Sequence, residues 1–153
     1  MNPSELKTLA QDIVKSASEL KDQHTAETNA QVNYACIFAQ SQKEFDELVA
    51  SANQLGQIVH QTPTGPLYQI APLQTVAGNL KLLKIRLPDE TRPELGDADF
   101  TVEDYARFKN TYLSEPGFKL IERPQMEMME LMDSMFEVRA YFSHPPLDQQ
   151  LGI

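Results

Sequence analysis

The chain has 153 residues, with 13 basic and 22 acidic side chains and a net charge of −9. This length is usual for one domain that buries a core without the help of disulfides or a structural metal. The single cysteine, Cys36, excludes an internal disulfide and an all-cysteine zinc site. The acidic balance argues against nucleic acid or an anionic membrane as a partner, since both need clustered positive charge. Because neither a secretory signal nor a long apolar run is visible, we expect a soluble, cytoplasmic protein.

Residues 4–22 have the pattern of an amphipathic helix. Its apolar side chains recur at steps of three and four and form one stripe: Leu6, Leu9, Ala10, Ile13, Val14, Ala17 and Leu20. Ser4 is in position to cap the first turn. Because the stripe is narrow and rich in alanine, we expect the helix to dock on the main body or on a partner, outside the core.

The next segment, residues 32–87, predicts a strand, a helix and three more strands. An apolar run over 32–39 predicts a buried strand, and Ser41 with Glu44 forms the capping box of a following helix that ends near Gly56. Strands are expected at 57–61, 67–70 and 80–87, with a proline- and glycine-containing turn at 62–66.

The same order of elements then repeats over residues 97–142. A strand at 97–102 and a helix at 103–113 precede strands at 118–123, 126–131 and 136–142. The polar, proline-containing stretch 88–96 joins the two segments. The repeat lies in the order of elements and not in the identity of residues.

Two consecutive βαβββ modules are the layout of the vicinal oxygen chelate superfamily, which contains glyoxalases, bleomycin-resistance proteins and extradiol dioxygenases. Over residues 32–142 the chain resembles a divergent member of this group. The resemblance implies an α+β fold in which both modules form one curved mixed sheet, with helices outside and a ligand in the hollow. The N-terminal helix is an added element, and a ferredoxin-like αβ sandwich is the main alternative fold.

The resemblance also implies a divalent metal held by His, Gln or Glu on the first and last strands of each module. In this chain those strands offer Asn33, Tyr34, Lys84, Arg86, Asp97, Asp99, Glu137 and Arg139. None is a histidine, and the fixed charge of Arg86 would repel a metal ion. We therefore predict no metal site and no cofactor.

Six polar residues on the strands that would face the hollow are the predicted ligand-binding set: Arg86, Asp97, Asp99, Glu137, Arg139 and Tyr141. Alternation along 136–142 places the last three on one face. The guanidinium groups of Arg86 and Arg139 could hold a carboxylate or phosphate bidentately, beside Tyr141. Alternatively, these residues form cross-strand ion pairs on a half-solvated sheet.

Two other segments allow two interpretations each. The stretch 91–99 either closes over a pocket as a gate or is a solvated link. A group of five methionines, which packs in the core or lines an apolar pocket, consists of Met126, Met128, Met129, Met132 and Met135.

The leading functional hypothesis is a metal-independent protein that binds a small anionic or carboxylate-bearing molecule in the hollow. A second hypothesis is a metal-dependent lyase, isomerase or dioxygenase of the same superfamily. A third is an interaction or scaffold protein that forms a homodimer through its N-terminal helix. No residue is assigned a catalytic role.

Overall fold

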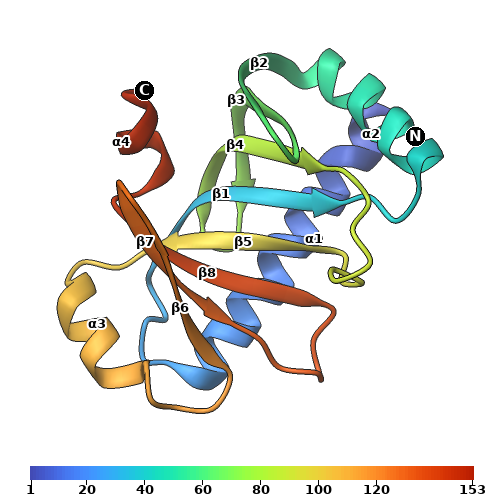
Figure 1. Ribbon diagram of the computed structural model, residues 1–153. Helices are drawn as coiled ribbons and strands as arrows, with labels where there is room; N and C mark the ends of the chain where they lie inside the picture. The colour runs from blue at the N-terminus through green and yellow to red at the C-terminus, as the bar shows by residue number, and fades with distance from the viewer.

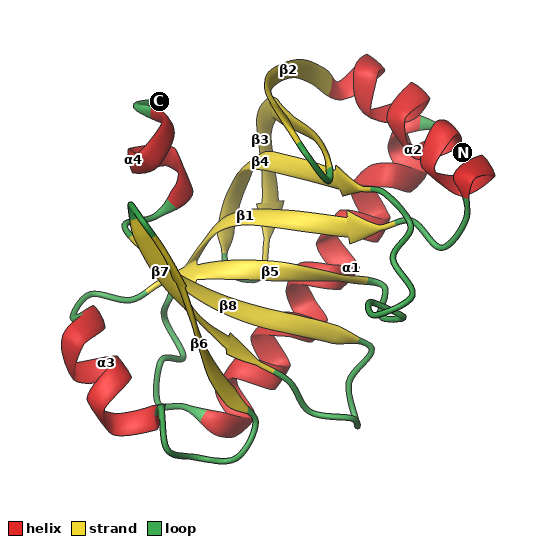
Figure 2. Ribbon diagram, viewed as in Figure 1, coloured by secondary structure: helices red, strands yellow, loops and turns green.

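The computed structural model describes residues 1–153 and contains four helices and eight strands (Figure 2). The helices are α1 (Pro3–His24), α2 (Gln42–Leu55), α3 (Tyr105–Tyr112) and α4 (Leu147–Leu151). The strands are β1 (Gln31–Phe38), β2 (Gly56–Thr62), β3 (Gly65–Thr75), β4 (Gly78–Arg86), β5 (Gly96–Thr101), β6 (Phe118–Arg123), β7 (Met126–Leu131) and β8 (Val138–His144). None of the helices combines the length and the apolar character needed to cross a membrane.

All eight strands belong to one mixed sheet in the order β2-β3-β4-β1-β5-β8-β7-β6. Within each module the first and last strands pair in parallel, β1 with β4 and β5 with β8. The modules join through the antiparallel pair β1–β5 at the centre of the sheet. The predicted α+β fold of two βαβββ modules with an added N-terminal helix is confirmed.

The expectation that the N-terminal helix lies outside the core is wrong. Helix α1 crosses behind the central strands in Figure 1 and contacts β1, β3, β5 and β8. Six side chains of its apolar stripe are at most 1% exposed: Leu6, Ala10, Ile13, Val14, Ala17 and Leu20. The small alanines permit close packing on the sheet, so a narrow stripe is sufficient. Because the stripe is buried within the chain, it is not free to pair with a second copy.

The ends of the elements follow local hydrogen bonding. The N-cap of α1 is Asn2 and not Ser4, because the Asn2 side chain accepts a hydrogen bond from the backbone N–H of Glu5 at 2.8 Å. The predicted cap of α2 is confirmed, since the backbone N–H of Glu44 donates to Oγ of Ser41 at 3.1 Å. Helix α4, a single short turn after two prolines, has too few residues to show a sequence period and was not predicted.

Alternation along the central strands separates two faces of the sheet. The face toward α1 carries small and apolar side chains that belong to one core cluster: Ala35, Ile37, Ala98, Phe100, Ala140 and Phe142. The opposite face, called here the open face, carries their neighbours Tyr34, Cys36, Asp97, Asp99, Arg139 and Tyr141. The methionine group is not all in one environment: Met129 is in the core, whereas Met135 is exposed in the turn between β7 and β8.

We predict that Ile13→Ala lowers the free energy of unfolding by about 3 kcal/mol, because it removes apolar atoms from the contact between α1 and the sheet. Urea unfolding followed by circular dichroism measures the change. Lys7→Ala, on the exposed side of the same helix, is the control and should change stability by less than about 0.5 kcal/mol. Equal effects of the two substitutions would contradict a core role for α1.

Candidate functional site

A hollow of about 450 Å³ lies on the open face and is lined by both modules. The four central strands contribute Tyr34, Cys36, Lys84, Arg86, Asp97 and Tyr141. The other lining residues come from the turn 62–64 between β2 and β3, from Arg92 in the loop between β4 and β5, and from Ile121, Arg123 and Met128 on β6 and β7. The hollow therefore lies where the two modules join, over β1 and β5.

Positive charge dominates the hollow although the chain as a whole is acidic. Four of the 13 basic residues line it, and Asp97 is the single carboxylate among its lining residues. Nζ of Lys84 donates a hydrogen bond to the Thr64 hydroxyl at 2.6 Å, and burial lowers the pKa of Lys84, with a further contribution from the nearby Arg86 charge. An anion entering this space would meet cations that are largely free of carboxylate partners.

Arg86 lies in the hollow as predicted, but its guanidinium is only partly satisfied. One terminal nitrogen, Nη2, makes a long 3.4 Å contact with Asp89. Its Nε is buried and has no hydrogen-bond partner. A buried donor without a partner is unfavourable, so a ligand oxygen that reached this N–H would form a favourable hydrogen bond.

Arg92 reaches the hollow from the loop between β4 and β5. Its guanidinium lies 5.4 Å above the centre of the Phe38 ring, and Nη1 donates to the Tyr141 hydroxyl at 3.1 Å. Nε2 of Gln40 donates a hydrogen bond to the carbonyl oxygen of Glu94 at 2.9 Å, and this contact also holds the loop in place. The loop is exposed at Thr91, Pro93 and Leu95, and it is held in place where Arg92 lines the hollow.

Arg139 does not line the hollow, which corrects its predicted role as an anion contact. Its Nε and Nη2 form a bidentate pair with Glu94 at 2.6 and 3.3 Å, Nη1 contacts Glu130 at 3.3 Å, and Nη2 also donates to the Thr91 carbonyl at 2.8 Å. With these donors engaged, Arg139 is a positioning residue: it holds the loop that carries Arg92. The ion-pair alternative considered for the sheet face therefore holds for this arginine.

Tyr141 lines the hollow as predicted, and its hydroxyl donates to Oε2 of Glu130 at 2.6 Å. Burial, followed by the nearby carboxylates of Asp97 and Glu130, raises the pKa of Tyr141 and keeps the phenol neutral. Glu137 is exposed and precedes the first residue of β8, Val138, so its predicted place in the site is wrong. Because Glu137 lies outside β8, the alternation of the strand does not determine the direction of its side chain.

Asp99 is buried on the open face beside the hollow and not in its lining. Its Oδ1 accepts hydrogen bonds from Nδ2 of Asn33 at 2.9 Å, and from the N–H and hydroxyl of Ser143 at 3.1 and 2.8 Å. Burial raises the pKa of Asp99 to about 6, against the effect of these hydrogen bonds. Asp99 is thereby a fixed structural group.

Asp97 differs from Asp99 because it faces the hollow without such partners. The residue is 5% exposed, and its Oδ1 makes no hydrogen bond. Burial first, and then the charge of Asp99, raises the pKa of Asp97 to about 7, although Arg92, Lys84 and Arg86 act in the opposite direction. This carboxyl therefore changes its charge near neutral pH.

The residues present do not fit the divalent metal that the superfamily resemblance implies. No group of three or more His, Cys, Asp and Glu side chains is placed to hold a metal ion. At the strand positions in question the hollow presents Lys84, Arg86 and Tyr141, with Asp97 as its single carboxylate. His60 is exposed on β2, and no histidine lines the hollow. The absence of a metal stays a prediction that metal analysis of the purified protein can test.

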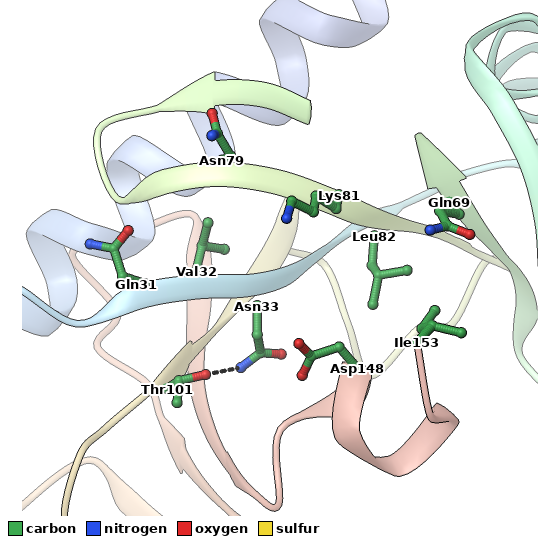
Figure 3. A pocket seen from close by; sticks show the side chains of 10 residues that line it. All are labelled: Gln31, Val32, Asn33, Gln69, Asn79, Lys81, Leu82, Thr101, Asp148 and Ile153. Atoms are coloured by element: carbon green, nitrogen blue, oxygen red, sulfur yellow. Dashed lines mark hydrogen bonds between the residues drawn. The ribbon is translucent and has the colours of Figure 1, made fainter. Parts of the chain in front are cut away.

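A second hollow of about 460 Å³ lies beside α4 at another part of the same sheet (Figure 3). Amide side chains are prominent in its lining, among them Gln31, Asn33 and Asn79. Asn33 donates to the Thr101 hydroxyl at 3.1 Å, the dashed line in Figure 3. Lys81 is its only basic side chain, so it lacks the cation cluster of the first hollow.

Sequence reasoning missed three of the four cations of the first hollow as ligand contacts. Alternation along β4 places Lys84 and Arg86 on one face, but only Arg86 was predicted as a ligand contact. Arg92 lies in a loop and Arg123 at the end of an edge strand, where no period predicts the direction of a side chain.

The sequence matches no protein-family model and no curated protein. Among solved structures, a structural-genomics protein, EC4020, superposes with a TM-score of 0.75 and 12% identity over 97% of this chain and 91% of that chain. A glyoxalase I mutant from Zea mays gives a TM-score of 0.38, with 14% identity over 76% of this chain and 44% of that one. A 4-hydroxymandelate synthase mutant from Streptomyces coelicolor gives 0.32, with 10% identity over 76% of this chain and 49% of that one. The similarity to EC4020 supports the fold over nearly the whole chain.

We predict that Asp97→Asn stabilises the protein at about pH 8 by on the order of 3 kcal/mol and has little effect at about pH 4. The folded-state pKa lies above that of the unfolded chain, so between those two values the folded state binds more protons and wild-type stability falls as pH rises. Urea unfolding at several pH values measures the difference. Asp12→Asn, at an exposed site on α1, should match wild type, and a parallel pH profile for Asp97→Asn would contradict the prediction.

We also predict that Arg139→Gln lowers the free energy of unfolding by about 3 kcal/mol, because it leaves Glu94 and Glu130 without their shared cation. Thermal and urea unfolding measure the loss. Arg107→Gln makes the same charge change at an exposed site on α3 and should be nearly neutral. A loss no larger than that of the control would show that the network does not hold the loop.

Proposed function

We propose that this chain is a metal-independent small-molecule-binding protein that holds a carboxylate-bearing ligand in the hollow of the open face. The observation that carries the proposal is the convergence of Lys84, Arg86 and Arg92 on one hollow, with Nε of Arg86 buried and unpartnered. A ligand oxygen would satisfy that donor and recover the free energy that its burial costs.

The remaining lining residues support a ligand with an apolar body. Pro63, Ile121 and Met128 offer apolar surface in the same hollow as the cations. A volume of about 450 Å³ is within the range of ordinary small-molecule sites. We therefore favour a carboxylate attached to an aromatic or branched aliphatic group, with Arg86 and Arg92 as its charged contacts and Tyr141 as a wall.

The arrangement of the two modules also supports the proposed ligand site. For two βαβββ modules, the resemblance to the vicinal oxygen chelate superfamily implies a ligand between the modules, and residues from both line this hollow. The metal-dependent alternative has no such support, because no group of His, Cys, Asp and Glu side chains is placed to hold a metal ion. The buried free thiol of Cys36 agrees with a cytoplasmic location, where thiols remain reduced.

We predict that benzoate binds and that benzamide, which has the same shape without the charge, does not. Arg86→Gln and Arg92→Gln should each weaken benzoate binding by at least about tenfold, because each removes a charged hydrogen-bond donor from the hollow. Isothermal titration calorimetry at low salt measures the affinities. The matched control, Arg107→Gln, removes an exposed arginine on α3 and should bind benzoate as wild type does.

Circular dichroism of each variant ensures that lost binding is not lost folding. Benzoate binding that is equal in wild type, Arg86→Gln and Arg92→Gln would place the anion elsewhere and contradict the proposed site. Equal affinities for benzoate and benzamide would contradict recognition by charge.

A further inference from the structure

The hollow contains a carboxyl group of its own, and this group is bonded to none of the cations around it. Among the carboxylates near the open face, Asp89 contacts Arg86, whereas Glu94 and Glu130 pair with Arg139. Asp97 forms no ion pair, and its Oδ1 is buried without a partner although it lines the same hollow as Lys84, Arg86 and Arg92. When Asp97 is ionised, it therefore has the same charge as a carboxylate that enters the hollow.

The titratable and charged groups around Asp97 come from every neighbouring element. On β1, burial raises the pKa of Tyr34 and of Cys36, which keeps both neutral. Lys84 and Arg86 on β4, Arg92 in the loop and Arg123 on β6 are cationic, whereas Tyr141 and Arg139 on β8 are engaged with Glu130 of β7. Asp99, on the same strand, is fixed by Asn33 and Ser143.

We propose that binding of a carboxylate ligand is coupled to the uptake of one proton by Asp97, so that the ligand's charge replaces the internal one. This inference rests on the proposed function and concerns the regulation of the same site. Two carboxylates that share a water-poor site repel each other, and a proton on one of them removes the repulsion. The proton comes from solvent and is bound at Asp97, whose lone pairs on Oδ1 are free.

The protonated carboxyl also provides a new hydrogen-bond donor. An O–H that donates to a carboxylate forms a short, strong hydrogen bond, so the neutral Asp97 would add a contact to the ligand as well as removing a repulsion. In the unliganded protein the pKa of Asp97 is about 7, so the group is largely ionised above neutral pH and must then gain a proton on binding. Ligand affinity should therefore fall as pH rises above neutrality.

Calorimetric titration of the full chain with benzoate at about pH 8, in the cationic buffers Tris and triethanolamine, tests the coupling. These buffers differ in ionisation enthalpy, so the difference between the observed binding enthalpies gives the number of protons exchanged. We expect an uptake that approaches one proton per benzoate. Across the range from about pH 7 to about pH 9, the affinity should fall by up to about tenfold per pH unit.

Asp97→Asn preserves the shape of the side chain and removes the titrating charge. It should abolish proton uptake, make benzoate affinity nearly independent of pH, and bind benzoate about tenfold more tightly than wild type at about pH 8. Asp12→Asn, at an exposed position, should retain the wild-type uptake.

Lys84 is the competing titratable group, because burial lowers its pKa and loss of its proton would also weaken anion binding. Lys84→Met should reduce the affinity and keep the proton uptake. Uptake that persists in Asp97→Asn and disappears in Lys84→Met would overturn the proposal. Benzoate binding without proton uptake would overturn it and leave the proposed function intact, whereas no benzoate binding by wild type at any pH would overturn both.

Discussion

Burial of charge on the open face of the sheet is the constraint on which the site depends. Packing of α1 on the other face requires the small and apolar side chains of β1, β5 and β8 to point toward the helix, so their polar neighbours all point the opposite way. Several of those neighbours are ionisable and almost fully buried, and a buried charge is tolerated only when its partners are in place. The same packing that forms the core therefore gathers the charges.

The way each charge is satisfied separates structural groups from candidate ligand contacts. Arg139 has two carboxylates and a carbonyl around it, and Asp99 accepts three hydrogen bonds on one oxygen. These contacts stabilise the loop and the strands, and neither residue lines the hollow. Arg86 and Asp97 line the hollow, and each has a buried polar atom without a partner there. Oδ2 of Asp99 also lacks a partner, but Asp99 does not line the hollow. Arg86 and Asp97 have opposite charges but form no ion pair with each other, so a polar group of a ligand could bind between them.

The sequence was sufficient for the order of elements and for the direction of side chains within the strands. Capping at Ser41 and the alternation along 138–142 are local signals, and the structure contains both features. The role of α1 was missed because the width of an apolar stripe does not report how closely small side chains permit a helix to approach. Glu137 was misplaced because β8 begins at Val138, two residues after the predicted start at 136, and Glu137 therefore lies outside the strand.

The roles of the arginines could not be predicted, because their partners are distant in the sequence. Arg139 meets Glu94 across 45 residues, and whether an arginine binds a ligand or holds a loop depends on such pairings and not on its face of the strand. Net charge was equally uninformative: a chain of −9 still collects four cations in one hollow.

Arg92 in the β4–β5 loop and Arg139 on β8 connect the site to the rest of the fold. Arg139 holds the loop through Thr91 and Glu94, and Arg92 from the same loop projects to Tyr141 in the hollow. The hydroxyl of Tyr141 donates a hydrogen bond to Glu130, which also pairs with Arg139. These contacts complete a network of hydrogen bonds and ion pairs along one wall of the hollow. A ligand that contacts Arg92 would thus bind a wall already ordered by the protein, so little conformational entropy would be lost on binding. Because residues of both modules line the hollow, such a ligand would also favour the joined arrangement of β1 and β5 and stabilise the fold by mass action.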